Sequence, residues 1–406
     1  MNALNLSLHP ALPDERFGEI KDMAQEVIIA SATLNGRVAK ETAATLGDRL
    51  RLLNSYHSNL IEGHKTSIVD IEAALNKEFS SDDDKRYSQE LCAGHVLTER
   101  ALMQEVLATP PDTLCSSDYL CKIHKAFYSQ LPEHHLFTHG QGGFTTYSVN
   151  PGEIRDTNVS LDEGHSIHGP DSNALKDKLN EFRYLYDPAN FHGDERLIAA
   201  AASHHRLSWL HPFRDGNGRV ARLFSGLYLA RIGINTGNLW SLSRGFSRKK
   251  QWYMINLQSA DLPDAAEKGF NQAYFADYCM YFLEVCLDQI RFMDKMLGLN
   301  MIDPRIDWYI QSRDKARGAS DPIDPRAAKL LKALFFLGEI PRGKAQTYMG
   351  MEKQTDRNAR RIVSQLLKEG LVTSDSHRAP LKIGFPTHVL KYYFPDLFDP
   401  NVVGTI

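Results

Sequence analysis

The feature that most constrains the fold is a pair of helical stretches joined by a short loop. The first stretch, GDERLIAAAASHHRLSWL at 193–210, and the second, GRVARLFSGLYLARIG from 218, both carry apolar residues at helical spacing. Between them, the sequence contains a proline and glycines, which end one helix and allow a sharp turn into the next. The segment HPFRDGNGRVAR (211–222) therefore predicts a loop that leads into a helix. Its mixture of charges is not that of a helix that only packs.

Helical patterning also dominates most of the first 300 residues. Residues 36–62 carry leucines at broadly helical spacing, and Gly63 is expected to cap that helix at its C-terminus. Thr66 or Ser67 is expected to cap the next helix. Further helices are predicted at 90–107, 116–131 and 173–187. The interruption is 139–161, where glycines and Asn-Pro-Gly separate β-prone pieces, which predicts a hairpin or flap.

The C-terminal quarter of the chain has a different pattern. Prolines and aspartates in DPRIDW and ASDPIDPRAA predict a linker at 301–325. Three short helical stretches and the β-turn-β piece TSDSHRAPLKIGF then follow, which is the order of a winged helix-turn-helix domain at 326–406. Its helices are rich in cations, namely Arg342, Lys344, Lys353, Arg357, Arg360, Arg361 and Lys368. Such a face predicts a DNA partner, although winged helices also bind proteins.

Composition limits the class of protein further. The chain has 406 residues, of which 42% are hydrophobic, and a formal net charge of −3, so any attraction to nucleic acid must come from a local patch. Its five cysteines are odd in number and contain no CxxC pair, which favours reduced thiols. No secretory signal is visible at the N-terminus, and no apolar stretch approaches the ~20 residues of a membrane span. We therefore expect a cytoplasmic protein with no membrane partner.

The start of the second helix has the chemistry of an anion site. Gly216, Asn217 and Gly218 place backbone N–H groups and the positive end of the helix dipole together, and glycine lets a phosphate approach the backbone. Arg219 and Arg222 are three residues apart and so lie on one helical face, where two guanidinium groups could grip a polyphosphate.

The loop before that helix adds the groups for a reaction. Asp215 is placed to hold a Mg²⁺ ion that bridges phosphate oxygens. His211 is suited to accept a proton from an attacking hydroxyl. Phe213 is better interpreted as an anchor in the core. A base, a metal ligand and an anion cradle within twelve residues predict phosphoryl or nucleotidyl transfer.

HPFRDGNGRVAR resembles the signature of Fic-domain proteins, His-Pro-Phe-x-Asp/Glu-Gly-Asn-Gly-Arg-x-x-Arg, at every specified position. The resemblance implies a mainly α fold: an N-terminal helical region (1–110), a helical Fic core (111–300) with a short β-hairpin flap, and the winged helix. It implies a protein adenylyltransferase that uses ATP and Mg²⁺. His211 would deprotonate a Tyr, Thr or Ser hydroxyl of a target protein or of the enzyme itself, and that oxygen would attack the α-phosphate. Asp215 would bind Mg²⁺, and residues 216–222 would hold the phosphates.

Residues 150–161, NPGEIRDTNVSL, resemble the Fic flap. An extended flap could pair with the backbone of the target protein and present its hydroxyl to His211. By the same resemblance, four flap residues would border the nucleotide: Thr157, Asn158, Val159 and Ser160. The alternative is an ordinary surface loop.

SNLIEG (58–63) resembles the family's inhibitory motif, Ser/Thr-x-x-x-Glu followed by Gly or Asn, here Gly63. Ser58 and Glu62 are i and i+4 on one helical face, so Glu62 could reach Arg222 and occupy the place of the γ-phosphate. The enzyme would then inhibit itself. The alternative is a solvated helix face, where an ion pair contributes little.

SRGFSRKKQWYMI (243–255) supplies the last candidates. By the resemblance, Trp252 or Tyr253 would line the adenine pocket. The alternative is a solvated basic face with two aromatic residues in the core.

Other functions use the same residues. A Fic protein can remove AMP with Glu62 positioning water, or can use another nucleotide donor. A third alternative is a DNA-binding transcriptional regulator whose Fic site is vestigial. The sequence leaves the target protein open, and also whether the chain is a monomer or a homodimer.

Overall fold

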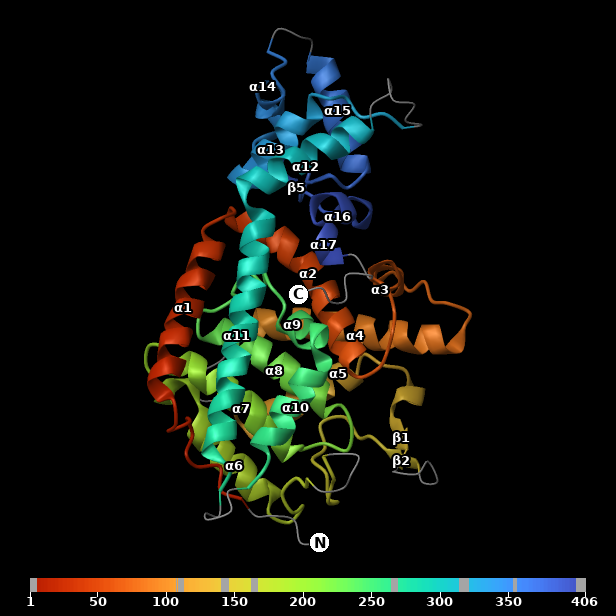
Figure 1. Cartoon of the computed structure of the whole chain (residues 1–406). Coiled ribbons are helices and arrows are strands. Elements are labelled where there is room, and N and C mark those ends of the chain that lie inside the picture. Colours follow the sequence, from red (N-terminus) through yellow and green to blue (C-terminus); the bar gives the residue numbers. More distant parts are fainter. Residues whose placement is uncertain are drawn as a thin grey trace. The chain divides into compact units, whose positions relative to one another are not determined.

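The computed structural model describes residues 6–106, 108, 113–139, 146–161, 167–263, 269–313, 321–352 and 356–398. Helices dominate them, as expected (Figure 1). The chain divides into two compact units. The first comprises Met1–Ala30, Asn54–Thr236 and Ser241–Gln289, and the second comprises Ser31–Leu53, Gly237–Trp240 and Ile290–Ile406. The units therefore do not follow the sequence segments expected.

The first unit contains all or part of eleven of the described helices. These are α1 (Phe17–Asn35), α2 (Lys40–Ile61), α3 (Ile68–Leu75), α4 (Asp83–Val106), α5 (Ser117–Tyr128), α6 (Leu175–Tyr186), α7 (Glu195–Leu210), α8 (Asn217–Arg231), α9 (Leu242–Arg248), α10 (Lys250–Ala260) and α11 (Gln272–Leu297). Two short 3₁₀ helices, η2 (Glu133–His135) and η3 (Pro188–Asn190), join them.

Helices α7 and α8 form the centre of this unit and pack closely against each other. Every residue of α7 from Leu197 to Leu207 is buried, and Ala199–Ala202 have no exposed surface. These small side chains let neighbouring helices approach the α7 backbone closely. Helices α6 and α10 pack on α7, and α4, α5 and α9 pack on α8. The loop between the two central helices is therefore held from several sides.

Two predicted helix ends are confirmed. Gly63 follows α2 with φ +95°, where it donates to the carbonyl of Leu60 at 3.0 Å. Ser67 caps α3, because its hydroxyl accepts from the backbone N–H of Asp70 at 3.1 Å.

The β interruption lies earlier than predicted. Strand β1 (Phe137–His139) pairs antiparallel with β2 (Thr146–Ser148), so the hairpin occupies the start of the predicted stretch. Residues 150–161 contain only an isolated bridge, from Ser160 to His168. Within this stretch, the carbonyl of Thr157 accepts from the side chain of Arg155 and not from a neighbouring strand, so no regular ladder forms there.

The second unit contains the C-terminal helices and a small sheet. Its elements are α12 (Leu299–Ser312), α13 (Ala327–Leu337), β3 (Glu339–Ile340), η5 (Arg342–Lys344), α14 (Ala345–Tyr348), α15 (Asp356–Lys368), β4 (Val372–Thr373), β5 (Leu381–Ile383), α16 (Thr387–Tyr393) and α17 (Pro395–Phe398). The three strands are antiparallel in the order β3-β5-β4, with β5 in the middle.

The predicted linker at 301–325 is wrong over residues 301–312, which belong to α12. Ile302, Ile306 and Ile310 are buried at helical spacing, and this apolar stripe packs on α13 and α16. Pro304 lies inside the helix, where it removes one backbone hydrogen bond. The burial of the isoleucines outweighs that loss. Residues 314–320 of the predicted linker lie outside the described residues.

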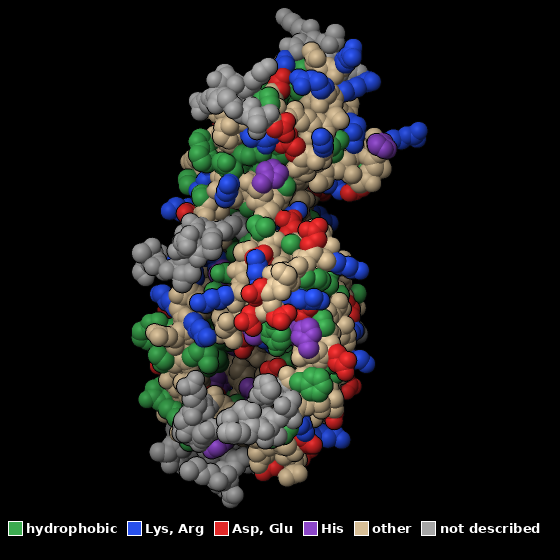
Figure 2. Space-filling model, turned by 90° about the vertical axis from the view of Figure 1, so that its right-hand side faces the viewer, with side chains coloured by type: hydrophobic (Ala, Val, Ile, Leu, Met, Phe, Trp, Pro, Cys, Tyr) green, Lys and Arg blue, Asp and Glu red, His purple; other side chains and the backbone are tan. Residues whose placement is uncertain are grey.

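Two of the expectations from the sequence concern the cysteines and membrane-spanning helices. All five cysteines are free thiols. Among the described residues, we find no helix with the length and apolarity that crossing a bilayer requires. Acidic and basic side chains are interspersed over the face drawn in Figure 2, in keeping with the small net charge.

Candidate functional site

His211 ends α7 in a left-handed conformation, with φ 45° and ψ 58°. Its backbone N–H donates to the carbonyl of Leu207 at 3.2 Å, and its own carbonyl accepts from Nε of Arg155 at 2.8 Å. Burial, together with the positive charge of Arg155, lowers the pKa of His211 to about 4. The imidazole is therefore neutral near pH 7 and can accept a proton.

Arg155 joins residues 150–161 to the central loop. Its side chain is buried and donates to four backbone carbonyls, those of Thr157, Pro170, Leu210 and His211. Its backbone N–H also donates to the carbonyl of Pro212 at 2.9 Å. Burial lowers its pKa to about 10, which keeps the guanidinium charged at neutral pH. The sequence predicts Arg155 as part of the flap, but not as the residue that braces His211.

Asn217 braces the loop from the other side. Its Oδ1 accepts from the backbone N–H of Phe213 at 2.9 Å, and its Nδ2 donates to the carbonyl of Phe213 at 2.7 Å. Both residues are buried. Asn217 was predicted to bind a nucleotide through its backbone N–H, and its side chain closes the turn between Phe213 and α8.

We expect Asn217→Ala to destabilise the protein by about 2–4 kcal/mol, because it leaves a buried N–H and a buried carbonyl of Phe213 unpaired. Urea unfolding followed by circular dichroism measures the change. Asn180→Ala, at an exposed asparagine of α6, is the matched control, and a change within about 0.5 kcal/mol is expected there. Equal stability of Asn217→Ala and the wild type would contradict this role.

The N-terminus of α8 begins at Gly216, which has φ +78°. A Cβ at this position would meet the ring of Tyr128 at 2.9 Å, so both the conformation and the space require glycine. The hydroxyl of Tyr128 donates to Oδ2 of Asp215 at 2.9 Å, and the N–H of Gly216 donates to Oδ1 at 2.7 Å. The carboxylate is thus oriented at the start of the helix while remaining partly exposed.

His124 connects the same loop to Gly152. The backbone N–H of Gly152 donates to Nδ1 of His124 at 2.8 Å, so the ring proton lies on Nε2, which donates to the carbonyl of Asp215 at 3.2 Å. The ring stacks on Phe213 with centroids 4.1 Å apart. His124 and Tyr128 were not predicted from the sequence. Their i, i+4 spacing on α5 was the available signal.

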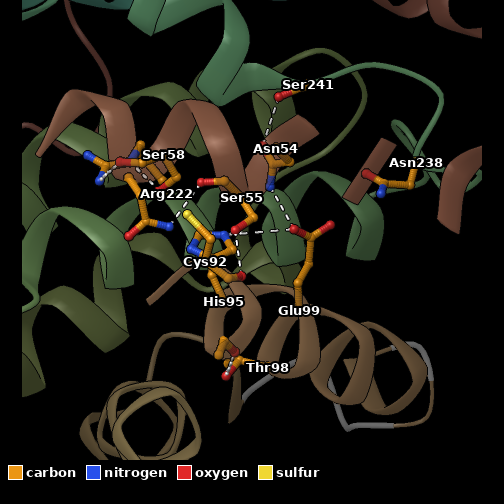
Figure 3. Close-up of polar contacts among 12 residues, drawn as sticks. Asn54, Ser55, Ser58, Cys92, His95, Thr98, Glu99, Arg222, Asn238 and Ser241 are labelled. Atoms are coloured by element: carbon orange, nitrogen blue, oxygen red, sulfur yellow. Dashed lines mark hydrogen bonds and ion pairs between the residues drawn. The ribbon is translucent and has the colours of Figure 1, made fainter. Parts of the chain in front are cut away.

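Arg219 and Arg222 lie on one face of α8, as predicted, and both are buried. Arg222 donates through Nε to Oγ of Ser58 at 2.9 Å and through Nη2 to the Ser58 carbonyl at 3.0 Å (Figure 3). Arg219 donates through Nε to Oδ1 of Asn59 at 3.1 Å. The last turns of α2 therefore hold both guanidinium groups in place.

Glu62 lies just after α2 and pairs with Arg222, with Oε1 2.5 Å from Nη2. The side chain of Arg222 is 2% exposed, whereas that of Glu62 is 34% exposed. Burial raises the pKa of Glu62, but Arg222 and Arg219 outweigh burial and hold the pKa below its ordinary value. A Cβ on Gly218 would collide with Oε1 of Glu62. An anionic group is therefore already present at the first turn of α8.

A cavity of about 290 Å³ opens beside these residues. Its lining includes Glu62, His211, Gly218, Arg222 and Tyr253. The structure thus brings together the predicted base, the predicted inhibitory residue and part of the predicted anion cradle.

The two aromatic residues predicted for the adenine pocket differ in their surroundings. Tyr253 is buried, and its hydroxyl lies 2.9 Å from Nε2 of His204, which positions its ring at the cavity wall. Trp252 is 60% exposed and does not line the cavity. Thr157 and Asn158 are also exposed, and Leu161 is the residue of the predicted flap that reaches the lining.

Part of the chain is similar to known proteins. Residues 114–229 match the model of the Fic/DOC family, a stretch that includes α5, α7 and the loop at 211–216. A protein adenylyltransferase Fic of Nematostella vectensis is 33% identical over 88 residues, which cover 22% of this chain and 20% of that protein. A protein adenylyltransferase Fic of Culex quinquefasciatus is 28% identical over 187 residues, which cover 44% and 32% respectively. The chain therefore spans a third or less of these relatives.

The solved structures agree in fold. The crystal structure of a Fic domain containing signalling protein from Bacteroides thetaiotaomicron superposes with a TM-score of 0.50 at 16% identity. The match covers 68% of this chain and 95% of that chain. At this level of identity the likeness shows a shared fold and no more.

Proposed function

We propose that the protein, whose residues 114–229 form a Fic domain, is a protein adenylyltransferase restrained by its own Glu62. It transfers AMP from ATP to a Tyr, Thr or Ser hydroxyl of a target protein or of itself. The observation that carries the proposal is the position of Glu62, whose carboxylate is paired with Arg222 against Gly218 at the start of α8. A site that attracts a carboxylate there is suited to the phosphates of a nucleotide. The names of the relatives support the type of transferase.

In this proposal, His211 is the general base. Its neutral imidazole takes the proton of the target hydroxyl, and the oxygen forms a bond to the α-phosphorus of ATP. The bond from that phosphorus to the bridging oxygen of pyrophosphate breaks, and pyrophosphate leaves with the electron pair. The side chain of Arg155 keeps His211 in position by donating a hydrogen bond to the His211 carbonyl. The protein contributes mainly positioning and charge neutralisation.

The charged tail of ATP would lie over the N-terminus of α8. The backbone N–H groups of Asn217 and Gly218 supply donors there, whereas that of Gly216 is bound to Asp215. Arg219 and Arg222 are already oriented by α2. Asp215 fits a Mg²⁺ ion, because it offers a hard, partly exposed carboxylate that two hydrogen bonds orient. When bound, Mg²⁺ supplies charge neutralisation at the phosphate oxygens.

Residues 156–158 are the proposed docking segment for the target protein. Asp156, Thr157 and Asn158 are exposed and lie outside any helix or strand, close in sequence to Arg155, which contacts the His211 carbonyl. A target backbone paired along this segment would bring its hydroxyl toward the cavity.

Mass spectrometry of the Glu62→Gly protein incubated with ATP and Mg²⁺ tests the proposal. We expect a mass gain of one AMP on the protein or on an added lysate protein, and no gain with Glu62→Gly/His211→Ala. The absence of any adduct with the folded Glu62→Gly protein would contradict the transferase proposal. A gain that survives the loss of His211 would contradict the assigned base. Parallel incubations with GTP, CTP and UTP identify a different donor.

The alternative activity is removal of AMP from a modified protein. It would use the same residues, with Glu62 positioning the attacking water. The test is to isolate the adduct made by Glu62→Gly and to incubate it with wild-type protein. Loss of AMP with the wild type and not with Glu62→Gly favours removal as the main activity.

DNA binding by the second unit is a second candidate, favoured by the surface of α15. We propose that α13, α14, α15 and the β3-β5-β4 sheet form a winged helix. Helix α15 buries Ala359, Ile362, Val363 and Leu366 and exposes Arg357, Arg360, Arg361 and Lys368. A helix with one apolar and one cationic face suits the major groove of DNA. A DNA-binding regulator with a vestigial site would show this binding without AMP transfer.

Fluorescence anisotropy with duplex DNA at several salt concentrations tests this candidate. Replacing Arg357 and Arg361 with alanine is expected to reduce the slope of log affinity against log salt by about two, one for each lost phosphate contact. Arg183→Ala, on an exposed position of α6, is the matched control and leaves the slope unchanged. An unchanged slope in the double variant would contradict DNA contact through α15.

A further inference from the structure

A second cluster of metal-ligating side chains lies on α4 and η2, outside the site described above. Glu90 of α4 is buried, and His134 and His135 form the end of η2. Oε2 of Glu90 lies 2.8 Å from Nε2 of His134 and 2.9 Å from Nε2 of His135. One ligand atom from each of the three residues lies within 4.8 Å of the other two. Two imidazoles and one carboxylate thus converge on one point.

From this convergence we propose that Glu90, His134 and His135 bind a divalent transition metal ion, with Zn²⁺ as the best match. Two histidines and a carboxylate are a ligand set of zinc sites that keep one position open. Metal–ligand bonds of about 2.0–2.2 Å put neighbouring ligand atoms about 3.3 Å apart in a tetrahedral site. The two separations from Glu90 Oε2 are a few tenths of an ångström shorter than this, so admitting the ion requires a small rotation of the side chains.

The protonation states favour ligation. Burial lowers the pKa of His135 to about 4, despite its hydrogen bond to Glu90, so this ring is neutral at pH 7. Burial raises the pKa of Glu90, but hydrogen bonds from Arg86, His135 and His134 outweigh burial, so the carboxyl is ionised. In the metal-free state the neutral His135 ring donates Nε2–H to Glu90. Ligation moves that ring proton to Nδ1 and leaves Nε2 free to bind the ion.

The surroundings orient the ligands and leave an entrance. Tyr87 lies against both rings, with centroids 4.0 Å from His135 and 5.9 Å from His134. Arg86 donates to Oε1 of Glu90 at 2.9 Å, so the other oxygen, Oε2, faces the histidines. The side chain of His134 is 52% exposed, whereas those of His135 and Glu90 are 1% and 3% exposed. An ion can therefore enter at His134, and water can complete its coordination.

The position of the cluster suggests what the ion would do. His135 is separated from β1 by Leu136, and Glu90 is in the middle of α4, which packs on α5 and α8. A bound ion would fasten the base of the β1–β2 hairpin to the helix that supports the central pair. This role does not depend on the proposed AMP transfer.

Cobalt titration of the untagged full-length protein tests the proposal. After removal of metals with EDTA and in the absence of nucleotide, we expect one equivalent of Co²⁺ to give a visible absorption band that Zn²⁺ abolishes. We expect His134→Ala to weaken binding by at least ~10-fold, since loss even of an outer-shell partner costs 10- to 100-fold. His134 is half-exposed, so this variant is expected to fold. Exposed His192 offers the control His192→Ala, which keeps full binding.

Thermal unfolding gives a second measurement. Zn²⁺ at tenfold excess over the protein is expected to raise the Tm of the wild type and of His192→Ala, and not that of His134→Ala. Glu90→Gln is expected to behave like His134→Ala. Wild-type protein that binds no stoichiometric Co²⁺, or a His134→Ala protein that binds it as tightly as the wild type, would overturn the proposal.

Discussion

We expect the Glu62→Gly protein to transfer AMP about 10- to 150-fold faster than the wild type at the same ATP concentration. This range follows from the charge-assisted hydrogen bond to Arg222, since such a bond contributes about 1.5–3 kcal/mol and a competing phosphate no longer has to displace it. The pKa of Glu62 lies below its ordinary value, so the carboxylate is charged and competes at any pH near neutrality. Incorporation of label from α-labelled ATP, measured as an initial rate, gives the ratio.

Glu62→Gln is the matched variant for this measurement. It keeps the size of the side chain and a hydrogen-bonding group toward Arg222, but removes the negative charge, so a rate between the wild type and Glu62→Gly is expected. Equal rates for all three proteins, each shown to be folded by circular dichroism, would mean that Glu62 does not restrain the site.

We expect His211→Ala, made in the Glu62→Gly protein, to lower the rate of the proposed AMP transfer by about 10²- to 10⁴-fold, the usual contribution of a general base. The loss appears in kcat more than in KM for ATP, because the imidazole acts on the hydroxyl and not on the phosphates. Initial rates at varied ATP concentration separate the two. A loss confined to KM would place His211 in binding instead of proton transfer.

The pH dependence of the same reaction checks the protonation state of His211. Its pKa is lowered to about 4, so the neutral, active form persists as the pH falls below neutrality. The rate in the Glu62→Gly protein is therefore expected to stay level through the ordinary range of a histidine. It should fall only as the pH is lowered through about 4, where the ring gains a proton and can no longer act as a base. Half-loss near the unperturbed value of about 6.5 would contradict a buried base.

The functional residues of segment 211–222 were predictable because they lie close together in the sequence. Glycines, a carboxylate and two arginines at the start of a helix are typical of an anion-binding site. The structure places Gly218, Arg222 and His211 around one cavity. The mainly helical fold and the capping roles of Gly63 and Ser67 were predictable for the same reason, since periodicity and caps are local signals.

The residues that support the loop could not be found this way. Tyr128, His124 and Arg155 act on it from positions 56 or more residues distant in sequence, and only the packing of α5 and residues 150–161 against it brings them near. Helix α12 was missed because its proline suggested a linker, while its stripe of isoleucines was the stronger signal. The exposure of Trp252 also depends on residues from elsewhere in the chain, which the local sequence pattern does not show.

The end of α2 separates the residues that hold the two arginines from the residue that occupies the anion position. Ser58 and Asn59, inside the helix, hold the guanidinium groups of Arg222 and Arg219, whereas Glu62 lies beyond Ile61, the last helical residue. Rotation of one side chain can thus vacate the anion position without melting a helical turn, and both arginines stay aimed at it. Release of the restraint would then be a rotamer change, which exposed side chains complete in nanoseconds or less. An activating signal need only bias that rotation and does not have to unfold the helix.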